Sequence, residues 1–432
     1  MSKNFWRGLL CLLAFFITLP FSVVQSDGPT KDARFYRQQA MAAYKAKNYA
    51  AFAENLEKAL QFTPDHPTLL YNLAIAYALL NRPQAALQTL ATVADMGLIY
   101  PAEKNADFDA LKNSEAFQAI IKRFAGNRAP LVKSEWAFGV EEKGLIPEGL
   151  AYDPTSQTFY LSSIHQRKIF AINRQGEARV FAEESQGLWA VAGMKVDAKR
   201  KILWAATAAV GQMVNLNRED EGRSGVLQFD LRTGKLLKRF EIRDRAKKHW
   251  LGDVAINSRG EVFATDSLAP ALYRIRPHQR EIEPVIEGEP FVSPQGLAFS
   301  SDEKHLFVAD YAKGIFEIEV TAKRAIKLAP PVNATLLGID GLYFYQGDLL
   351  AVQNGVNPHR LIRLKLNDKL NAITKVDLVE ANNPQFAEPT LGVVVKDAFY
   401  FIANSQWDLI DDHGKFASLE KLQPVRVLKM KL

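Results

Sequence analysis

One short phrase recurs through the last 300 residues of the chain: an apolar strand that opens with a polar or acidic residue and a glycine. Clear copies lie at residues 147–153, 294–300 and 339–344, and weaker copies at 192–197, 252–257 and 390–395. A turn and a second apolar run follow each copy. Repeats about 45–60 residues apart are typical of a radial β array, because each unit is one small sheet that cannot bury its own faces. The repeat predicts a six-bladed β-propeller.

The count of strands predicts how the propeller closes. Each unit has four expected strands, but the sixth lacks its outer strand because the chain ends at Leu432. A spare strand around Trp136 precedes the first unit. We expect it to pair with the strand around Val427, which closes the ring and leaves no free sheet edge. The fold class is therefore mainly β, with the propeller over residues 131–432.

The preceding segment, residues 27–125, has a helical pattern. Ala, Leu, Lys, Glu and Gln dominate it, and its apolar positions recur at helical spacing. Two units resemble tetratricopeptide repeats, since Ala59 and Val93 lie 34 positions apart, which is the period of that repeat. Two repeats are few for an independent solenoid, so we expect this helical domain to pack on the propeller or on a protein partner. Residues 126–130 are the expected linker.

The first residues predict export. Lys3 and Arg7 precede an apolar run over residues 8–21, which is the pattern of a secretory signal peptide, here residues 1–26. An uncleaved anchor is the alternative. The only cysteine, Cys11, lies in this segment, so the mature chain needs no disulfides. We expect a periplasmic or secreted protein that has no membrane segment after cleavage.

Charge gives little information about partners. The formal net charge is +6, and residues 195–248 are rich in Lys and Arg. This stretch lacks the interleaved aromatic residues of a nucleic-acid groove, so it is interpreted as a solvated blade edge and no nucleic-acid partner is expected.

The order of strands predicts that one face of the propeller carries the long loops. The insertions at 208–224 and 405–424 both join a second to a third strand, and such loops open on the same face. Trp189, Trp250 and Trp407 belong to loops of this face. They could line an apolar substrate pocket, and packing of the long loops is the equal alternative.

Other polar residues of this face are expected to have structural or surface roles. Asp266, Asp310 and Asn404 end second strands, where such residues usually fix turns. Four histidines lie in separate loops with no ligand spacing, so we expect mobile surface groups. They are His165, His249, His359 and His413.

The phrases around Glu148-Gly149, Gln295-Gly296 and Asp340-Gly341 resemble those of the gluconolactonase and senescence-marker-protein (regucalcin-like) family, and more distantly strictosidine synthase. The resemblance covers about residues 131–432. It implies a propeller with one divalent ion in its channel, usually calcium. Because this fold hosts enzymes and pure binders alike, the resemblance specifies chemistry poorly.

The resemblance also implies a ligand set. The family's metal ligands are a Glu at the first repeat, an Asn at the fourth and an Asp at the fifth, which correspond to Glu148, Gln295 and Asp340. Gln295 departs from the pattern by one methylene. A further family Asn, which touches substrate, corresponds to Gly252, which has no side chain for such a contact, and the neighbouring Asp253 is the candidate to replace it.

Elementary electrostatics makes the two retained carboxylates informative. Glu148 and Asp340 would repel each other in one narrow channel, so one would be protonated unless a cation or base lies between them. A hard, oxygen-liganded ion such as Ca²⁺ removes that conflict, and Gln295 can supply a carbonyl oxygen. The alternative is that both acids cap nearby strand-end amides.

Two functions follow from these observations. The first is an exported hydrolase that acts on a lactone or small ester. The ion would polarise the carbonyl and activate water, and Asp253 or an ion-bound carboxylate would accept the proton. The second is a non-catalytic scaffold, with a small ligand at the propeller channel and a protein partner at the helical repeats. Tetratricopeptide-like helices are common docking surfaces, which favours the second.

Overall fold

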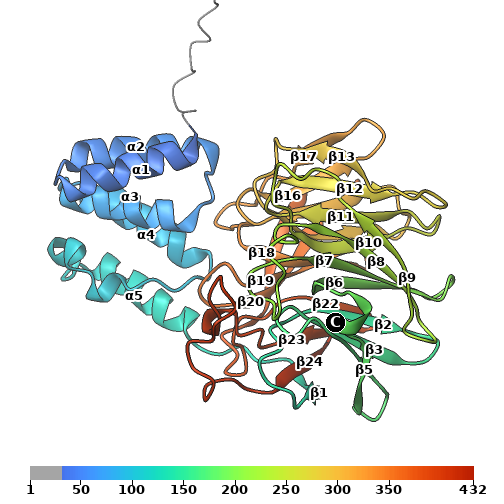
Figure 1. Cartoon of the computed structure of the whole chain (residues 1–432). Coiled ribbons are helices and arrows are strands. Elements are labelled where there is room, and N and C mark those ends of the chain that lie inside the picture. Colours follow the sequence, from blue (N-terminus) through green and yellow to red (C-terminus); the bar gives the residue numbers. More distant parts are fainter. Residues whose placement is uncertain (1–31) are drawn as a thin grey trace, which may run out of the picture.

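The computed structural model describes residues 32–432 and divides into a helical region and a six-bladed β-propeller (Figure 1). The predicted signal peptide lies outside the described residues. Within residues 32–432, no helix combines the length and the apolar character needed to cross a membrane.

Five α-helices and two short 3-10 helices form the helical region. They are α1 (Ala33–Lys45), α2 (Tyr49–Phe62), α3 (Pro67–Leu79), α4 (Pro83–Asp95), η1 (Ala102–Lys104), η2 (Ala106–Leu111) and α5 (Glu115–Asn127). α1 packs on α2, and α3 packs on α4. Asp32 begins α1 by accepting a 2.8 Å bond from the Phe35 amide, and prolines occupy the first positions of α3 and α4. α5 continues through the first two residues of the predicted linker.

Each blade is one four-stranded antiparallel sheet. The strands of blades 1 to 3 are β2 (Pro147–Asp153), β3 (Thr158–Ser163), β4 (Ile169–Ile172), β5 (Ala178–Ala182), β6 (Ala190–Asp197), β7 (Ile202–Ala208), β8 (Ser224–Asp230), β9 (Leu236–Glu241), β10 (Leu251–Ile256), β11 (Val262–Asp266), β12 (Ala271–Ile275) and β13 (Glu283–Glu287). Those of blades 4 to 6 are β14 (Pro294–Phe299), β15 (Leu306–Asp310), β16 (Gly314–Glu319), β17 (Arg324–Lys327), β18 (Ile339–Tyr345), β19 (Asp348–Gln353), β20 (Arg360–Leu366), β21 (Ile373–Ala381), β22 (Gly392–Val395), β23 (Ala398–Ile402), β24 (Val425–Lys431) and β1 (Glu135–Val140).

The last blade closes as the sequence predicts. Its order is β1-β24-β23-β22, so the amino-terminal strand supplies the outer edge of the final sheet. Trp136 pairs with Leu428 and Phe138 pairs with Val427, with a register shift between the two pairs. The sixth sheet therefore has its fourth strand, and the ring closes.

The glycine of the repeated phrase lies where the innermost strands of neighbouring blades approach each other. A Cβ on Gly149 would be 2.3 Å from the carbonyl oxygen of Ala192 in the next blade, and one on Gly296 would be 2.4 Å from that of Asp340. Real Cβ atoms do not come so close, so these two positions tolerate only glycine. This packing aligns the residues before the glycines around one central channel.

The helical region docks on loops of blades 4 and 5, as Figure 1 shows for α4 and the β19–β20 side of the propeller. The buried Arg360 guanidinium donates from Nη1 to the carbonyl oxygen of Met96 at 2.6 Å. Leu336 N donates to the Asp65 carboxylate at 3.2 Å. The expected packing of the helices on the propeller is thereby confirmed.

Candidate functional site

Four acidic side chains gather at the mouth of the channel. Glu148 and Asp340 start the inner strands of blades 1 and 5, Asp253 belongs to that of blade 3, and Glu388 precedes β22. Asp253 and Asp340 are 6% and 8% exposed, while Glu148 and Glu388 are half-buried. Burial raises the pKa of all four carboxyl groups, and repulsion from other members of the group raises the pKa of Glu148 and Asp340 further.

Glu148 is held from the long loop of the last blade. The Trp407 indole Nε1 donates a 2.9 Å hydrogen bond to Glu148 Oε2, and the Trp250 ring lies 5.9 Å from the Trp407 ring between centroids. Burial raises the pKa of Glu148 well above its ordinary value, and the nearby Asp340 carboxylate raises it further. The indole bond opposes this by favouring the ionised form.

Asp340 is held by a chain of side-chain hydrogen bonds. Asn354 Nδ2 donates to Asp340 Oδ2 at 2.8 Å, and Tyr311 OH donates to Asn354 Oδ1 at 3.0 Å. Burial is the largest cause of the raised pKa of Asp340, the Asn354 bond lowers it, and repulsion from Asp253 and Glu388 raises it. Asn354 and Tyr311 follow the second strands of blades 5 and 4, so equivalent positions of two repeats support one carboxylate.

Asp253 takes the place that glycine has in the clear repeats. Its carboxylate fits because the neighbouring blade has a glycine at residue 193. A Cβ on Gly193 would lie only 2.3 Å from Asp253 Oδ1. The Val254 amide donates to that oxygen at 2.8 Å. Burial raises the pKa of Asp253 to about 6, against a smaller lowering by Lys195. A carboxylate with such a pKa can exchange a proton near neutral pH.

Gln295 presents its carbonyl oxygen to the channel. Its Nε2 donates to Ser293 Oγ at 3.1 Å, which fixes the orientation of the amide. Its Oε1 lies beside Gly252, where a Cβ would be only 3.3 Å away. The missing side chain at Gly252 thus accommodates the extra methylene of glutamine.

The three predicted ligands have the donor atoms that a hard cation requires. Glu148, Gln295 and Asp340 each have one side-chain oxygen that accepts no hydrogen bond from any residue in 32–432. Nor does either carboxylate cap a main-chain amide of these residues, so the capping alternative is wrong. Residues 32–432 contain no group of three His, Cys, Asp or Glu side chains that could hold a metal ion, so a site here depends on the Gln295 oxygen.

Trp407 contacts Glu148 and Trp250 packs beside Trp407, whereas Trp189 has a different environment. Its ring is 4% exposed, and the guanidinium groups of Arg239 and Arg223 cover it at 4.5 and 4.9 Å from the centroid. Such cation–π stacking stabilises the loops of blade 2.

Two of the four face histidines are not surface groups, so that expectation was wrong for them. His165 is 8% exposed, and its Nδ1 lies 2.5 Å from the carbonyl oxygen of Gln212 in the long loop of blade 2. His249 is 2% exposed, and its Nδ1 lies 2.6 Å from Asp266 Oδ2. The long loop of blade 2 contacts both residues, since the Gly222 carbonyl oxygen accepts from the His249 amide at 2.9 Å. His359 is half-buried, and His413 is exposed.

The expected turn-fixing role is confirmed for Asp266 and for Asp310, whose Oδ1 accepts from the Ala312 amide at 3.0 Å, whereas Asn404 bonds to the far end of its long loop. Asp266 Oδ1 accepts from the amides of Trp250 and Leu268 at 3.0 and 3.1 Å. Asp310 Oδ2 accepts from the Val292 and Ser293 amides at 2.7 and 2.8 Å. Asn404 Oδ1 accepts from the Arg426 amide at 2.7 Å.

Sequence reasoning missed three residues of the site: Tyr311, Asn354 and Glu388. Tyr311 and Asn354 directly follow second strands and so belong to the same face as the long loops. Glu388 lies four residues before Gly392, the glycine of the sixth repeat. Glu148, by contrast, directly precedes its glycine, Gly149. Strand order could have indicated all three, but the repeated phrase contains none of them.

No protein-family profile matches the chain, and no curated protein matches it. Among solved structures, a gluconolactonase from Xanthomonas campestris is 14% identical over 71% of this chain and 92% of its own, with a TM-score of 0.47. A PQQ-bound aldose sugar dehydrogenase from Streptomyces coelicolor is 14% identical over 70% and 100%, with a TM-score of 0.48. A virginiamycin B lyase from Staphylococcus aureus is 12% identical over 69% and 100%, also with a TM-score of 0.48. Their names denote different reactions.

Proposed function

We propose that the channel mouth hydrolyses a lactone or small ester with the help of a divalent cation. The observation that carries the proposal is the set of oxygens of Glu148, Gln295 and Asp340 that lack a protein donor, next to a buried Asp253. Buried carboxylates without a cation lose free energy by desolvation and repulsion. A bound cation would offset this cost, which gives a reason for the buried carboxylates at the channel mouth.

Glu148, Gln295 and Asp340 would hold the ion, and calcium suits their oxygen atoms best. When bound, such an ion polarises a carbonyl group and lowers the pKa of a coordinated water molecule. Trp407 and Asn354 each fix one carboxylate oxygen, which leaves the other oriented for the ion.

Asp253 would act as the proton acceptor. Its pKa of about 6 leaves it mostly ionised at neutral pH and basic enough to take a proton from water. The main-chain bond from Val254 restricts its orientation. Proton transfer by a positioned base contributes about 10²–10⁴-fold to a rate.

Hydrolysis should depend on both the ion and Asp253. The test is a panel of lactones and small esters, assayed on protein stripped with chelator and then supplied with calcium. We expect turnover only with calcium, and a loss of about 100-fold or more in Asp253→Asn. Asp368→Asn, at an exposed position, is the matched control and should keep full activity. Calcium-loaded protein that hydrolyses no member of the panel would exclude the enzyme.

A non-catalytic binding protein is the second candidate. The observation in its favour is the cleft between the helical region and the propeller described below, which is large enough for a ligand. For either function we propose export, because of the charged and apolar start of the chain. Amino-terminal sequencing of the exported form should find a start near residue 27, and a start at Met1 would contradict this.

A further inference from the structure

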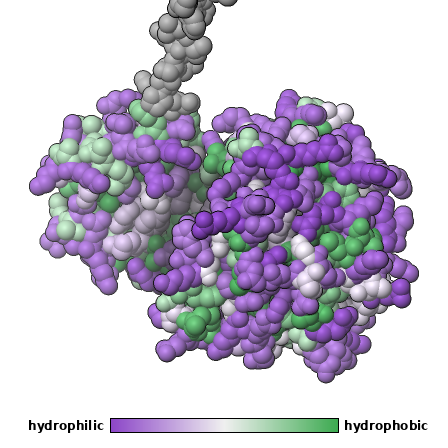
Figure 2. All heavy atoms as spheres, in the orientation of Figure 1, coloured by the Kyte–Doolittle hydropathy of each residue, from purple (hydrophilic) through white to green (hydrophobic). Residues whose placement is uncertain are grey.

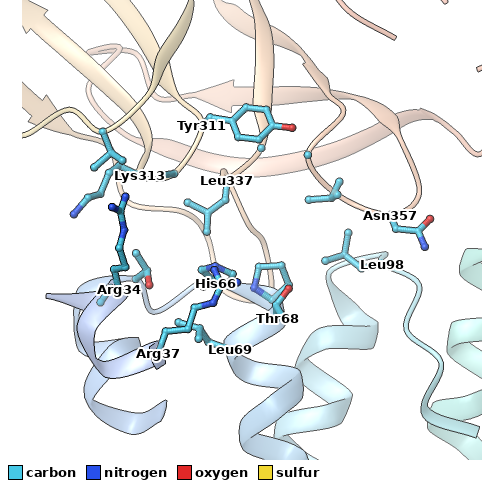
Figure 3. Close-up of a pocket in the computed structure, with 18 of the residues that line it drawn as sticks. Arg34, Arg37, His66, Thr68, Leu69, Leu98, Tyr311, Lys313, Leu337 and Asn357 are labelled. Atoms are coloured by element: carbon cyan, nitrogen blue, oxygen red, sulfur yellow. The ribbon is translucent and has the colours of Figure 1, made fainter. Parts of the chain in front are cut away.

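A cleft of about 880 Å³ lies between the helical region and the loop face of the propeller. The surface is hollowed there (Figure 2), and Figure 3 shows that side chains from both parts face the hollow. One wall comes from α1, the start of α3 and the segment after α4, and the other from loops of blades 4 and 5. Its volume is that of a typical small-molecule site.

A hydrogen bond within the cleft itself joins the two walls. Ile99 N donates to the carbonyl oxygen of Asn357 at 2.7 Å, and both residues line the cleft. The propeller wall is tightly packed: a Cβ on Gly355 would lie 2.5 Å from Gly338 Cα and 2.6 Å from Tyr311 OH. The cleft is therefore pre-formed, which lowers the entropic cost of binding.

Cationic groups gather at one end of the cleft. Arg34 of α1 extends toward Lys313 of the propeller, and Arg37 lies near His66 (Figure 3). None of the three cations forms an ion pair within residues 32–432, whereas most arginines of the propeller do. Burial and then Arg37 lower the pKa of His66, so this ring is neutral at pH 7.

Two carboxylates also line the cleft, but one is already engaged. Asp32 caps α1 through the Phe35 amide, and Glu289 is the other. The three cations exceed these acids by one charge, and an arginine and a lysine from opposite walls can hold one anionic group between them.

The rest of the lining is apolar. Leu69 and Leu98 come from the helical wall and Leu337 from the propeller, and all three are buried. The Tyr311 ring borders the same space, and its hydroxyl is the first group of the hydrogen-bond chain to Asp340. A ligand here would thus contact apolar side chains next to the channel mouth.

We propose that this cleft binds an organic anion with an apolar body, its charged group between Arg34 and Lys313 and its body against the leucines. The helical region then supplies half of a ligand site. This inference does not depend on hydrolysis at the acidic cluster, because binding can be measured without turnover.

Two fluorescent probes with one skeleton test the proposal. 8-Anilinonaphthalene-1-sulfonate carries an anionic group, and N-phenyl-1-naphthylamine lacks it. We expect saturable binding of the sulfonate by the full folded chain, at least fivefold tighter than that of the neutral probe. Equal affinities for the two probes, or no saturable binding of the sulfonate, would overturn the proposal.

Substitutions inside and outside the cleft test where the two probes bind. Arg34→Ala with Lys313→Ala should weaken the sulfonate at least fivefold and leave the neutral probe within twofold, while Lys122→Ala with Arg232→Ala, at exposed positions outside the cleft, should change neither. Ala312→Trp fills the cleft from the propeller side and should weaken both probes. Thermal melting confirms that each variant is folded. Unchanged binding in the folded Ala312→Trp protein would place the probes elsewhere and overturn the proposal.

Discussion

The Trp407 indole donates a 2.9 Å hydrogen bond to Glu148 across 259 residues of sequence. It joins the long loop of the last blade to the first strand of the first blade, the point where the ring closes. This bond therefore links the closure of the propeller to the orientation of Glu148, a candidate metal ligand. Because Trp407 also contacts Trp250, the loop has an apolar anchor that does not involve Glu148.

Removing that bond should weaken calcium binding without unfolding the loop. Trp407→Phe keeps the aromatic packing but loses the indole donor. A hydrogen bond to a charged group contributes about 1.5 kcal/mol, so we expect an affinity about tenfold weaker in calorimetric titration at pH 7. Trp250→Phe is the control and should stay within twofold. Equal affinities in the two variants would show that the bond has no role in the site.

Calcium should stabilise the parent protein and not the Asp340→Asn variant. At one hundred times the dissociation constant, the ion adds about 2.7 kcal/mol to the free energy of unfolding. In chelator, Asp340→Asn should be at least as stable as the parent, because burial and repulsion penalise the native charge. Thermal melting with calcium and with chelator measures both effects. A parent that melts identically in the two conditions would contradict a metal site and favour the binding function.

Stability of the chelated protein should fall as pH rises through the range in which Asp253 ionises. Its pKa is about 6 in the folded chain and 3.8 ordinarily, so the native state binds more protons between these values. The difference corresponds to about 3 kcal/mol. Asp253→Asn should therefore match the parent near pH 4 and exceed it in urea unfolding at pH 7.5, by up to that amount. A constant difference between the two proteins across this range would contradict a raised pKa.

The fold was predictable because the repeat reflects a packing requirement. Only glycine fits where Gly149 and Gly296 meet the next blade, so the repeated phrase is visible in the sequence wherever an inner strand makes this contact. The residue before each glycine then reaches the channel, which is why Glu148 and Asp340 could be placed together in advance.

The supports of the site were less predictable. Trp407 lies in a long insertion without periodicity, and Asn354 lies outside the repeated phrase. The cleft depends on how the helical region docks, and that is decided by single contacts such as Arg360 to Met96. Local patterns contain no information on such long-range contacts.

The closing strand should matter through Phe138 and not through Trp136. Phe138 is 8% exposed and its ring lies 4.8 Å from that of Phe159, whereas Trp136 is 55% exposed. Phe138→Ala should cost about 3–5 kcal/mol in urea unfolding, and Trp136→Ala less than about 1 kcal/mol. Similar small costs for both variants would mean that this strand does not complete the last sheet.

Replacing Arg360 should weaken the contact between the helical region and the propeller. Its guanidinium is 3% exposed and donates to Gln353 Oε1 at 2.7 Å and to the Met96 carbonyl at 2.6 Å. Arg360→Met leaves these buried acceptors unpaired, which costs about 1–3 kcal/mol each. We expect the helical region to unfold before the propeller, giving two thermal transitions and faster proteolysis between residues 96 and 101. Arg259→Met, where the side chain is 69% exposed, is the control and should melt like the parent. A single unshifted transition in Arg360→Met would show that other contacts hold the two parts together.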